Sequence, residues 1–194
     1  MDSLSRAREA IDAIHARDPA RDAAGNPAEL TYANRMEGWV QRLVPDASPL
    51  LLLAARCQHL ERWAVPRSTF PIDRVGYLRW RKSLYTRQAE LARDTLVQAG
   101  VAASEASEVA TWVSKSGLKT NPGTQALEDA ACLVFLENEI AHFAAQHQDY
   151  PPEKFVDIIR KTWAKMSEPA RAAAQTLTLD PGVAPLVKQA LESS

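Results

Sequence analysis

The sequence predicts an all-α protein that forms a single domain over residues 1–194, built as a bundle of about seven to nine helices. Apolar residues recur at spacings of three and four along most of the chain, which is the period of an amphipathic helix. No segment shows the alternation of apolar and polar residues that is typical of a strand. Proline, glycine and capping residues separate the periodic segments, and we expect each segment to form one helix.

The expected helices follow one another along the whole chain, and several have a clear start or stop. Ser48 followed by proline is a start signal, Asp73 is a capping residue, and Gly100 ends the helix that Asp73 begins. The segment 124–147 is the most apolar, so we expect it to be a central helix that others surround. The predicted helices cover 3–17, 30–44, 49–63, 73–100, 104–115, 124–147, 151–166, 167–177 and 180–192.

Composition and charge narrow the classes of function. The formal net charge of −1 gives no electrostatic reason to expect a nucleic acid or an anionic membrane as partner. No apolar run approaches the roughly 18 residues of a membrane span, and the N-terminus lacks the apolar core of a signal peptide. Cys57 and Cys132 both lie in apolar helical segments, so we expect buried free thiols and a cytoplasmic protein. The sequence does not determine the oligomeric state, and a homodimer is one of the states that it allows.

The stretch 54–63, AARCQHLERW, departs from an ordinary amphipathic pattern. If the helix 49–63 is continuous, Ala55 shares one face with three polar residues at i+3, i+4 and i+7, which are Gln58, His59 and Arg62. That face continues the apolar start of the same helix, so we expect the three polar side chains to point towards the protein interior. Cys57 falls off this face, and a thiol nucleophile is therefore disfavoured.

A carboxylate is expected on the buried side of the most apolar helix. Asp129 belongs to the stripe that continues with Cys132, Leu133 and Leu136. An uncompensated buried carboxylate costs several kcal/mol, so Asp129 must be paired, protonated, hydrated or bound to a metal. Its candidate partners are the polar residues on the apolar stripes of other helices, which are His15, His59, Arg62 and Arg81.

Two interpretations of these inward polar residues compete. In the first they form a buried structural network, in which Asp129 pairs with Arg81 or Arg62 and the histidines are satisfied core residues. In the second they line a cleft in which His15, His59 and Asp129 bind a divalent metal. Imidazole with carboxylate suits zinc, manganese, iron or nickel, and the sequence does not choose among them.

The second interpretation assigns further roles. Guanidinium groups bind phosphate or carboxylate with two parallel hydrogen bonds, so the arginines are expected to face a small anionic substrate. Glu61 or Glu128 would transfer protons beside a metal-bound water, although each reads equally as a surface charge at a helix edge. Lys115 and Lys119 flank the Gly117 turn and either clamp an anion or are simply solvated. The expected substrate-binding residues are Gln58, Arg62, Arg67, Arg81 and Lys119.

Several long stretches carry a resemblance to a known family: AIDAIHARDP (10–19), TYANRMEGWVQRL (31–43), AARCQHLERWAVPRSTFP (54–71), YLRWR (77–81), TQALEDAACLVFLE (124–137) and IIRKTWAKMS (158–167). Together they resemble the helical family catalogued as domain of unknown function 4202, over nearly the whole chain. This resemblance implies an all-helical fold and brings little information about activity.

The order of elements is also distantly similar to HD-type metal phosphohydrolases, which implies an HD-like bundle. In that family a His-Asp doublet ends an apolar helix, and an earlier histidine and a late aspartate complete a metal site. Here Gln58-His59 stands at the doublet, Tyr32 near the earlier histidine and Asp129 at the late aspartate. The resemblance implies either an altered metal site that recruits His15 or a helical scaffold that has lost its metal.

These observations lead to three hypotheses of function. The first is a metal-dependent hydrolase of a small phosphorylated or nucleotide-like molecule. The second is a non-catalytic small-anion-binding or regulatory protein that uses the same arginines without metal. The third is a helical interaction module whose buried polar groups are structural.

Overall fold

The computed structural model describes residues 1–192, and within them the chain is all-α, as predicted. This part of the chain forms ten α-helices and no β-strand. The helices belong to two compact units, unit 1 (Met1–Leu127) and unit 2 (from Glu128 onwards). None of the described helices combines the length and the apolarity that crossing a membrane requires. The single domain over residues 1–194 and the HD-like arrangement stay predictions.

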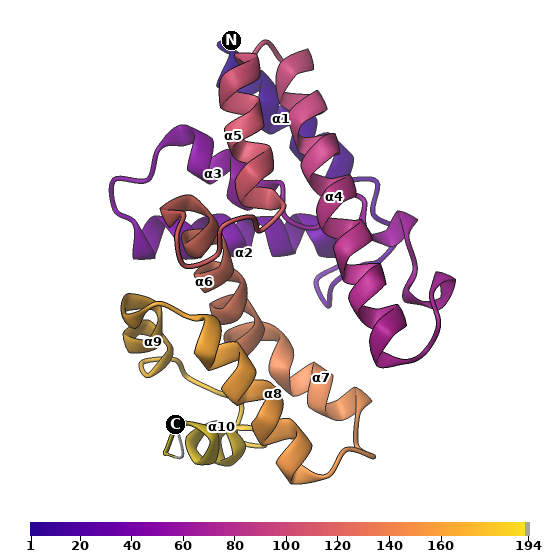
Figure 1. Ribbon diagram of the computed structural model, residues 1–194, viewed down its shortest axis with the longest axis vertical. Coiled ribbons are helices and arrows are strands. Elements are labelled where there is room, and N and C mark those ends of the chain that lie inside the picture. The colour runs from indigo at the N-terminus through magenta and orange to yellow at the C-terminus, as the bar shows by residue number, and fades with distance from the viewer. Residues whose placement is uncertain (193–194) are drawn as a thin grey trace. The chain divides into compact units, whose positions relative to one another are not determined.

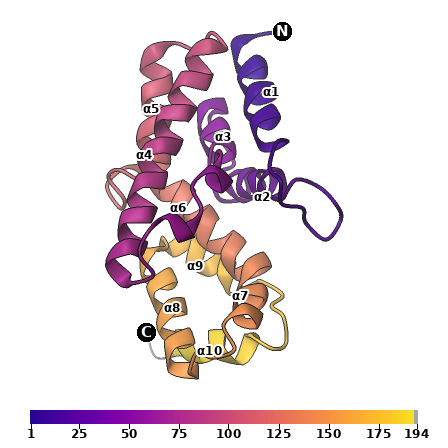
Figure 2. The same cartoon turned by 90° about the vertical axis from the view of Figure 1, so that its right-hand side faces the viewer.

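Unit 1 is organised around its longest helix, α4 (Arg74–Gln98), which has 25 residues. α4 packs against α5 and α1, α3 contacts both α1 and α5, and α2 crosses these helices (Figures 1 and 2). Fully buried side chains fill the space between them, among them Ile11, Met36, Leu60, Leu84 and Leu96. The bounds are α1 Ser3–His15, α2 Ala28–Leu43, α3 Pro49–Arg56, α4 Arg74–Gln98 and α5 Ala103–Val113, and α6 (Pro122–Val134) begins in this unit.

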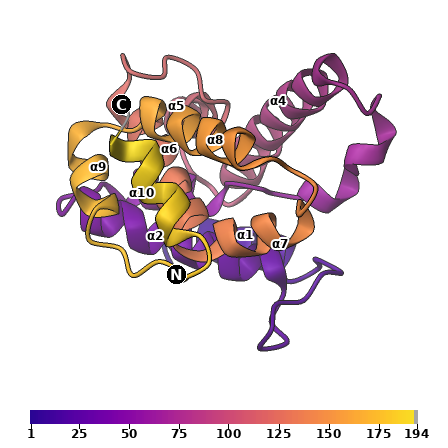
Figure 3. The same cartoon turned by 90° about the horizontal axis from the view of Figure 1, so that it is seen from below.

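Unit 2 starts within α6, which continues through a π-helical turn at Phe135–Glu139 into α7 (Ile140–Gln146). The helix predicted at 124–147 therefore exists, but it is not one regular α-helix. Its buried residues Ala130, Leu133 and Leu136 fit the predicted central position. α8 (Pro152–Lys165), α9 (Glu168–Ala174) and α10 (Ala184–Glu192) follow, and α10 packs against α8 (Figure 3).

The local signals read from the sequence are confirmed. The Ser48 hydroxyl accepts a hydrogen bond of 3.2 Å from the amide of Leu51, and the Asp73 carboxylate accepts one of 2.6 Å from the amide of Gly76. Cys57 and Cys132 are buried thiols that form no disulfide, as predicted. Burial raises the pKa of the Cys57 thiol, so this group stays protonated and unreactive.

The prediction of a continuous helix over 49–63 is wrong, because α3 ends at Arg56. A continuing helix would use the Arg56 carbonyl as acceptor for the amide of Leu60. Instead that carbonyl lies 2.7 Å from Nε2 of His15, and the amide of Leu60 donates to Cys57. The following residues form turns, with His59 in the left-handed region. Gln58, His59 and Arg62 therefore do not share a helix face with Ala55.

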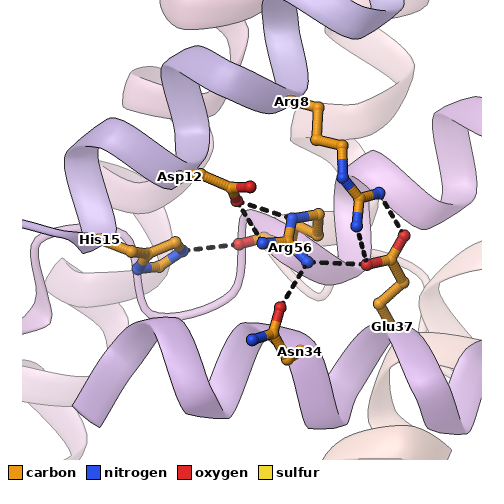
Figure 4. Close-up of polar contacts among 6 residues, drawn as sticks. All are labelled: Arg8, Asp12, His15, Asn34, Glu37 and Arg56. Atoms are coloured by element: carbon orange, nitrogen blue, oxygen red, sulfur yellow. Dashed lines mark hydrogen bonds and ion pairs between the residues drawn. The ribbon is translucent and has the colours of Figure 1, made fainter. Parts of the chain in front are cut away.

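The end of α3 carries a buried arginine that joins three helices (Figure 4). The Arg56 side chain is 2% exposed, and its guanidinium donates to Asp12 of α1 and, over 2.9 and 2.7 Å, to Asn34 and Glu37 of α2. Arg8 of α1 donates two further hydrogen bonds, of 2.5 and 2.7 Å, to Glu37. Burial alone would raise the pKa of Glu37, but the bonds from Arg8 and Arg56 outweigh burial and lower it. Two carboxylates thus compensate the buried charge and tie α1 and α2 to α3.

Removing the Arg56 side chain should destabilise the protein strongly. Arg56→Ala leaves Glu37 buried with one cationic partner fewer and opens a void, so we expect a loss of about 3–5 kcal/mol in the free energy of unfolding. Urea denaturation followed by circular dichroism measures this loss. Arg35→Ala, at an exposed position of the same α2, is the matched control and should change stability by less than about 0.5 kcal/mol. Equal effects of the two substitutions would contradict the central role of Arg56.

Candidate functional site

Unusual backbone marks two short segments of unit 1. Within the described residues, the non-glycine residues with positive φ are His59 (64°), Glu61 (47°), Lys115 (60°) and Lys119 (71°). Such conformations are costly for most side chains and concentrate at functional sites. His59, Glu61 and Lys119 are site residues predicted from the sequence, and Lys115 belongs to the same turn as Lys119. The strain therefore coincides with the segments that the sequence singles out.

The His59 imidazole is held from two sides by residues of α2. Its Nδ1 lies 3.0 Å from Oε2 of Glu29, and the Tyr32 ring stacks on it with the centroids 4.0 Å apart. The side chains of His59 and Glu29 are 24% and 16% exposed. The second ring nitrogen, Nε2, lies 3.5 Å from Nη1 of Arg62. With Glu29 ionised, Nδ1 carries the proton and Nε2 presents its lone pair.

The surroundings favour a neutral imidazole at physiological pH. Burial lowers the pKa of His59, and the charges of Arg62 and Lys115 lower it further against the opposing effect of Glu29. Burial also opposes the ionisation of Glu29, but its interactions with His59 and Arg62 outweigh burial and lower its pKa. The pair is therefore a neutral imidazole hydrogen-bonded to a carboxylate, the arrangement in which a histidine accepts a proton from another group.

Glu29 is absent from the site predicted from the sequence, because the predicted helix begins at residue 30. α2 begins at Ala28, so Glu29 shares the buried stripe of Tyr32 and Met36 at i+3 and i+7. The carboxylate of Asp18, which is 1% exposed, accepts a hydrogen bond of 2.9 Å from the amide of Glu29 and fixes this first turn. Acidic residues are common in the first turn of a helix, and this preference is the sequence signal that could have placed Glu29 inside α2.

Arg62 contacts His59, the charge of Lys115 acts on the same imidazole, and each of the two cations also lies over an aromatic ring. The Arg62 guanidinium is 4.8 Å from the ring centroid of Trp80. The Lys115 ammonium is 5.5 Å from the ring centroid of Tyr85 and close enough to His59 to lower its pKa. Ring faces attract cations and restrict their positions. The site thus combines a proton acceptor with two positive charges, a set of groups that suits a small anion.

His15 and Glu61 have structural contacts of their own, and Gln58 is buried. His15 is fully buried with Nε2 against the Arg56 carbonyl, and burial lowers its pKa. Gln58 precedes His59 and is 4% exposed. The Glu61 carboxylate accepts hydrogen bonds of 3.2 and 2.6 Å from Arg17 and Arg87. Its contacts thus link the end of α1 to α4.

The remaining predicted residues of unit 1 lie on other segments. Arg67 donates to backbone carbonyls of the loop before α4. Arg81 bonds the hydroxyl of Tyr85 one turn later in α4. Lys119 is exposed on the turn before α6. The structure therefore brings His59 and Arg62 together, with Gln58 beside them in the chain, and places Lys115 where its charge acts on His59.

Asp129 and Glu128 belong to unit 2, where both are buried and bonded. The two carboxylate oxygens of Asp129 accept hydrogen bonds of 2.8 and 2.6 Å from the amide and hydroxyl of Ser167, the capping residue of α9. Glu128 forms an ion pair of 3.3 Å with Lys165 of α8. The compensation that the sequence requires for Asp129 is thus supplied at least in part within its own unit.

The predicted metal ligands are engaged in other interactions. His15 uses Nε2 at a carbonyl, His59 uses Nδ1 at Glu29, and Asp129 uses both oxygens at Ser167. Among residues 1–192 no group of three or more His, Cys, Asp or Glu side chains is arranged to hold a metal ion. We therefore derive no chemical step through a metal, and the divalent metal stays a prediction.

The fold and the site define a helical protein with a carboxylate-held histidine beside two cations. Comparison with known proteins identifies the family: a family model described as Domain of unknown function (DUF4202) matches residues 5–187, and the chain belongs to this family. The resemblance seen in the sequence is thereby confirmed. No curated protein and no solved structure matches the chain.

The Glu29–His59 pair predicts a specific titration. The wild-type His59 should titrate below 6.5, the ordinary value for histidine, because burial and two cations disfavour its charged form. In Glu29→Gln the pKa of His59 should fall further, since the carboxylate is the group that favours protonation. NMR of the imidazole Cε1–H signal against pH measures both values, with His59→Asn for assignment. Glu9→Gln, at an exposed position of α1, should leave the titration unchanged; a rise in Glu29→Gln would refute the pairing.

Proposed function

We propose that the protein binds a small anionic molecule, most simply a phosphorylated one, at the cluster of His59, Arg62 and Lys115. The observation that carries this proposal is that Arg62 lies against a neutral histidine in a partly exposed setting, and that the charge of Lys115 acts on the same imidazole. A phosphate oxygen can accept from a guanidinium and an ammonium together, and Arg62 offers it a planar set of donors. This function is the second hypothesis drawn from the sequence and needs no metal.

The restrained side chains of Arg62 and Lys115 support the same proposal. Arg62 lies over Trp80 and Lys115 near Tyr85, so both cations are already restrained before a ligand arrives. Less conformational entropy is then lost on binding than with freely moving side chains. The left-handed backbone at His59 and Lys115 restrains the same segments.

Binding of inorganic phosphate tests this proposal. A ligand that binds only the folded protein stabilises it by about 2.7 kcal/mol at a concentration of 100 Kd, so millimolar phosphate should raise Tm measurably. Arg62→Gln should abolish most of the shift, whereas Arg35→Gln, at an exposed arginine of α2, should keep it. Absence of a shift in the wild type, or an equal shift in Arg62→Gln, would rule out this site.

A second candidate is hydrolysis of the bound phosphorylated molecule, and the Glu29–His59 hydrogen bond favours it. In the neutral imidazole the Nδ1–H donates to Glu29, which leaves Nε2 able to take a proton from a water that attacks phosphorus. The bond from phosphorus to the ester oxygen then breaks, and the leaving alkoxide takes up the proton from the imidazolium as an alcohol. Arg62 and Lys115 would then stabilise negative charge that develops on the phosphoryl group. The first hypothesis drawn from the sequence is also a hydrolase, but it is metal-dependent, with His59 as a metal ligand and Glu61 or Glu128 as the group that transfers protons.

Hydrolysis of a chromogenic phosphomonoester separates the two candidates. If His59 is the base, His59→Asn should lower kcat by about 10²–10⁴, while phosphate binding, whose hydrogen-bond donors belong to Arg62 and Lys115, should fall much less. Asparagine is chosen because it tolerates the left-handed backbone. Elemental analysis of the same preparations tests the predicted divalent metal with His15, His59 and Asp129 as ligands. Activity that is lost on chelation and restored by one metal would favour the metal-dependent form, and unchanged activity in His59→Asn would exclude His59 as the base.

A further inference from the structure

A group of exposed apolar side chains lies at the start of α4 and in the loop before it. Ile72, Val75, Tyr77 and Leu78 are 81%, 56%, 42% and 53% exposed. The other strongly exposed large apolar residues among those described are Met1 and Val97. A concentration of this kind within seven residues is unusual for a surface that meets only water, and it marks an interaction site. We call residues 70–82 the α4 tip.

Positive charge accompanies these apolar residues on one face of the helix. Val75, Leu78, Arg79 and Lys82 follow the i, i+3, i+4, i+7 spacing and are all exposed. Arg74 adds a further exposed cation at the first helical position. No acidic residue lies between positions 74 and 82, and the carboxylate of Asp73 is used as the cap of the helix.

The α4 tip is held in a fixed shape. Arg67 donates hydrogen bonds of 3.0, 2.7 and 3.2 Å to the carbonyls of Phe70, Pro71 and Asp73. The absence of a side chain at Gly76 lets the Pro71 carbonyl approach, since a Cβ there would lie 2.1 Å from its oxygen. These contacts present Ile72 and the start of α4 as one rigid projection.

We propose that the α4 tip docks on an anionic lipid surface. Within unit 1 the loop before α4 and the start of this helix project away from the other helices (Figures 1 and 3). A convex projection offers little area to a second folded protein, whereas a bilayer interface deforms around it. Apolar side chains at the front with cations beside them match the headgroup region, where exposed tyrosine is also favoured. Two copies of this basic face would repel each other.

The overall charge does not argue against such a surface. The net charge of −1 led us to expect no anionic membrane partner, but it sums charges over all 194 residues. Screening limits each charge to a range of about 10 Å, so a membrane responds to the local group of Arg74, Arg79 and Lys82. The proposal is independent of any anion bound at His59.

Vesicle flotation tests the proposal with the full-length protein. Wild type should float with vesicles of phosphatidylcholine that contain about one third phosphatidylglycerol, and much less with phosphatidylcholine alone or at high salt. The double variant Ile72→Ser/Leu78→Ser should lower the bound fraction at least about tenfold. Arg79→Gln/Lys82→Gln should lower it on anionic vesicles only. All four positions are exposed, so circular dichroism should show unchanged folding.

Two single variants on the same helix serve as controls. Val97→Ser removes an exposed apolar residue and Arg93→Gln an exposed cation, both far from the α4 tip along α4. Each should bind vesicles as the wild type does. The proposal is overturned if the wild type does not float with anionic vesicles, if the double variants bind as strongly as the wild type, or if the controls lose as much binding as they do.

Discussion

The hydrogen bonds of the buried Arg56 guanidinium with two carboxylates are the interaction on which the rest of unit 1 depends. A charge with so little access to water persists only because the carboxylates of Asp12 and Glu37 accept its hydrogen bonds. These partners belong to α1 and α2, so compensating the charge also sets how both helices pack on α3. The backbone carbonyl of Arg56 accepts a hydrogen bond from Nε2 of His15. This bond ends α3, and the chain then turns through His59, whose φ is positive. The geometry of the candidate site therefore follows from the contacts of one structural residue, Arg56.

Local signals were sufficient to predict most helices, because both partners of a local interaction stand together in the sequence. Ser48 and Asp73 each cap an amide three residues further on, and both starts are confirmed. The end of α3 is not local, since the donor to the Arg56 carbonyl lies 41 residues earlier in the chain. Apolar periodicity alone predicts a helix that continues to residue 63. The face that this prediction gives to Ala55, Gln58 and His59 is wrong, because the contact with His15 that ends α3 comes from a distant part of the sequence.

Some contacts of the candidate site join residues that are close in the sequence, and others join residues that are far apart in it. Arg62 lies beside His59 as expected, but through a turn and not along a helix. Glu29 was missed because an error of two residues at the start of α2 moved it from a buried stripe into a loop. For Asp129 the sequence showed that partners are needed, whereas the choice of Ser167 depends on how α9 packs.

Arg56 also couples α1 to the turn that carries His59. Its side chain and its carbonyl are both bonded to α1, through Asp12 and His15. If α1 detaches, both bonds break in one step and the turn that carries His59 loses the contact that ends α3. α1 and this turn therefore open as one cooperative segment. A ligand that holds the turn closed would slow hydrogen exchange of the amides in α1, a helix that it need not touch.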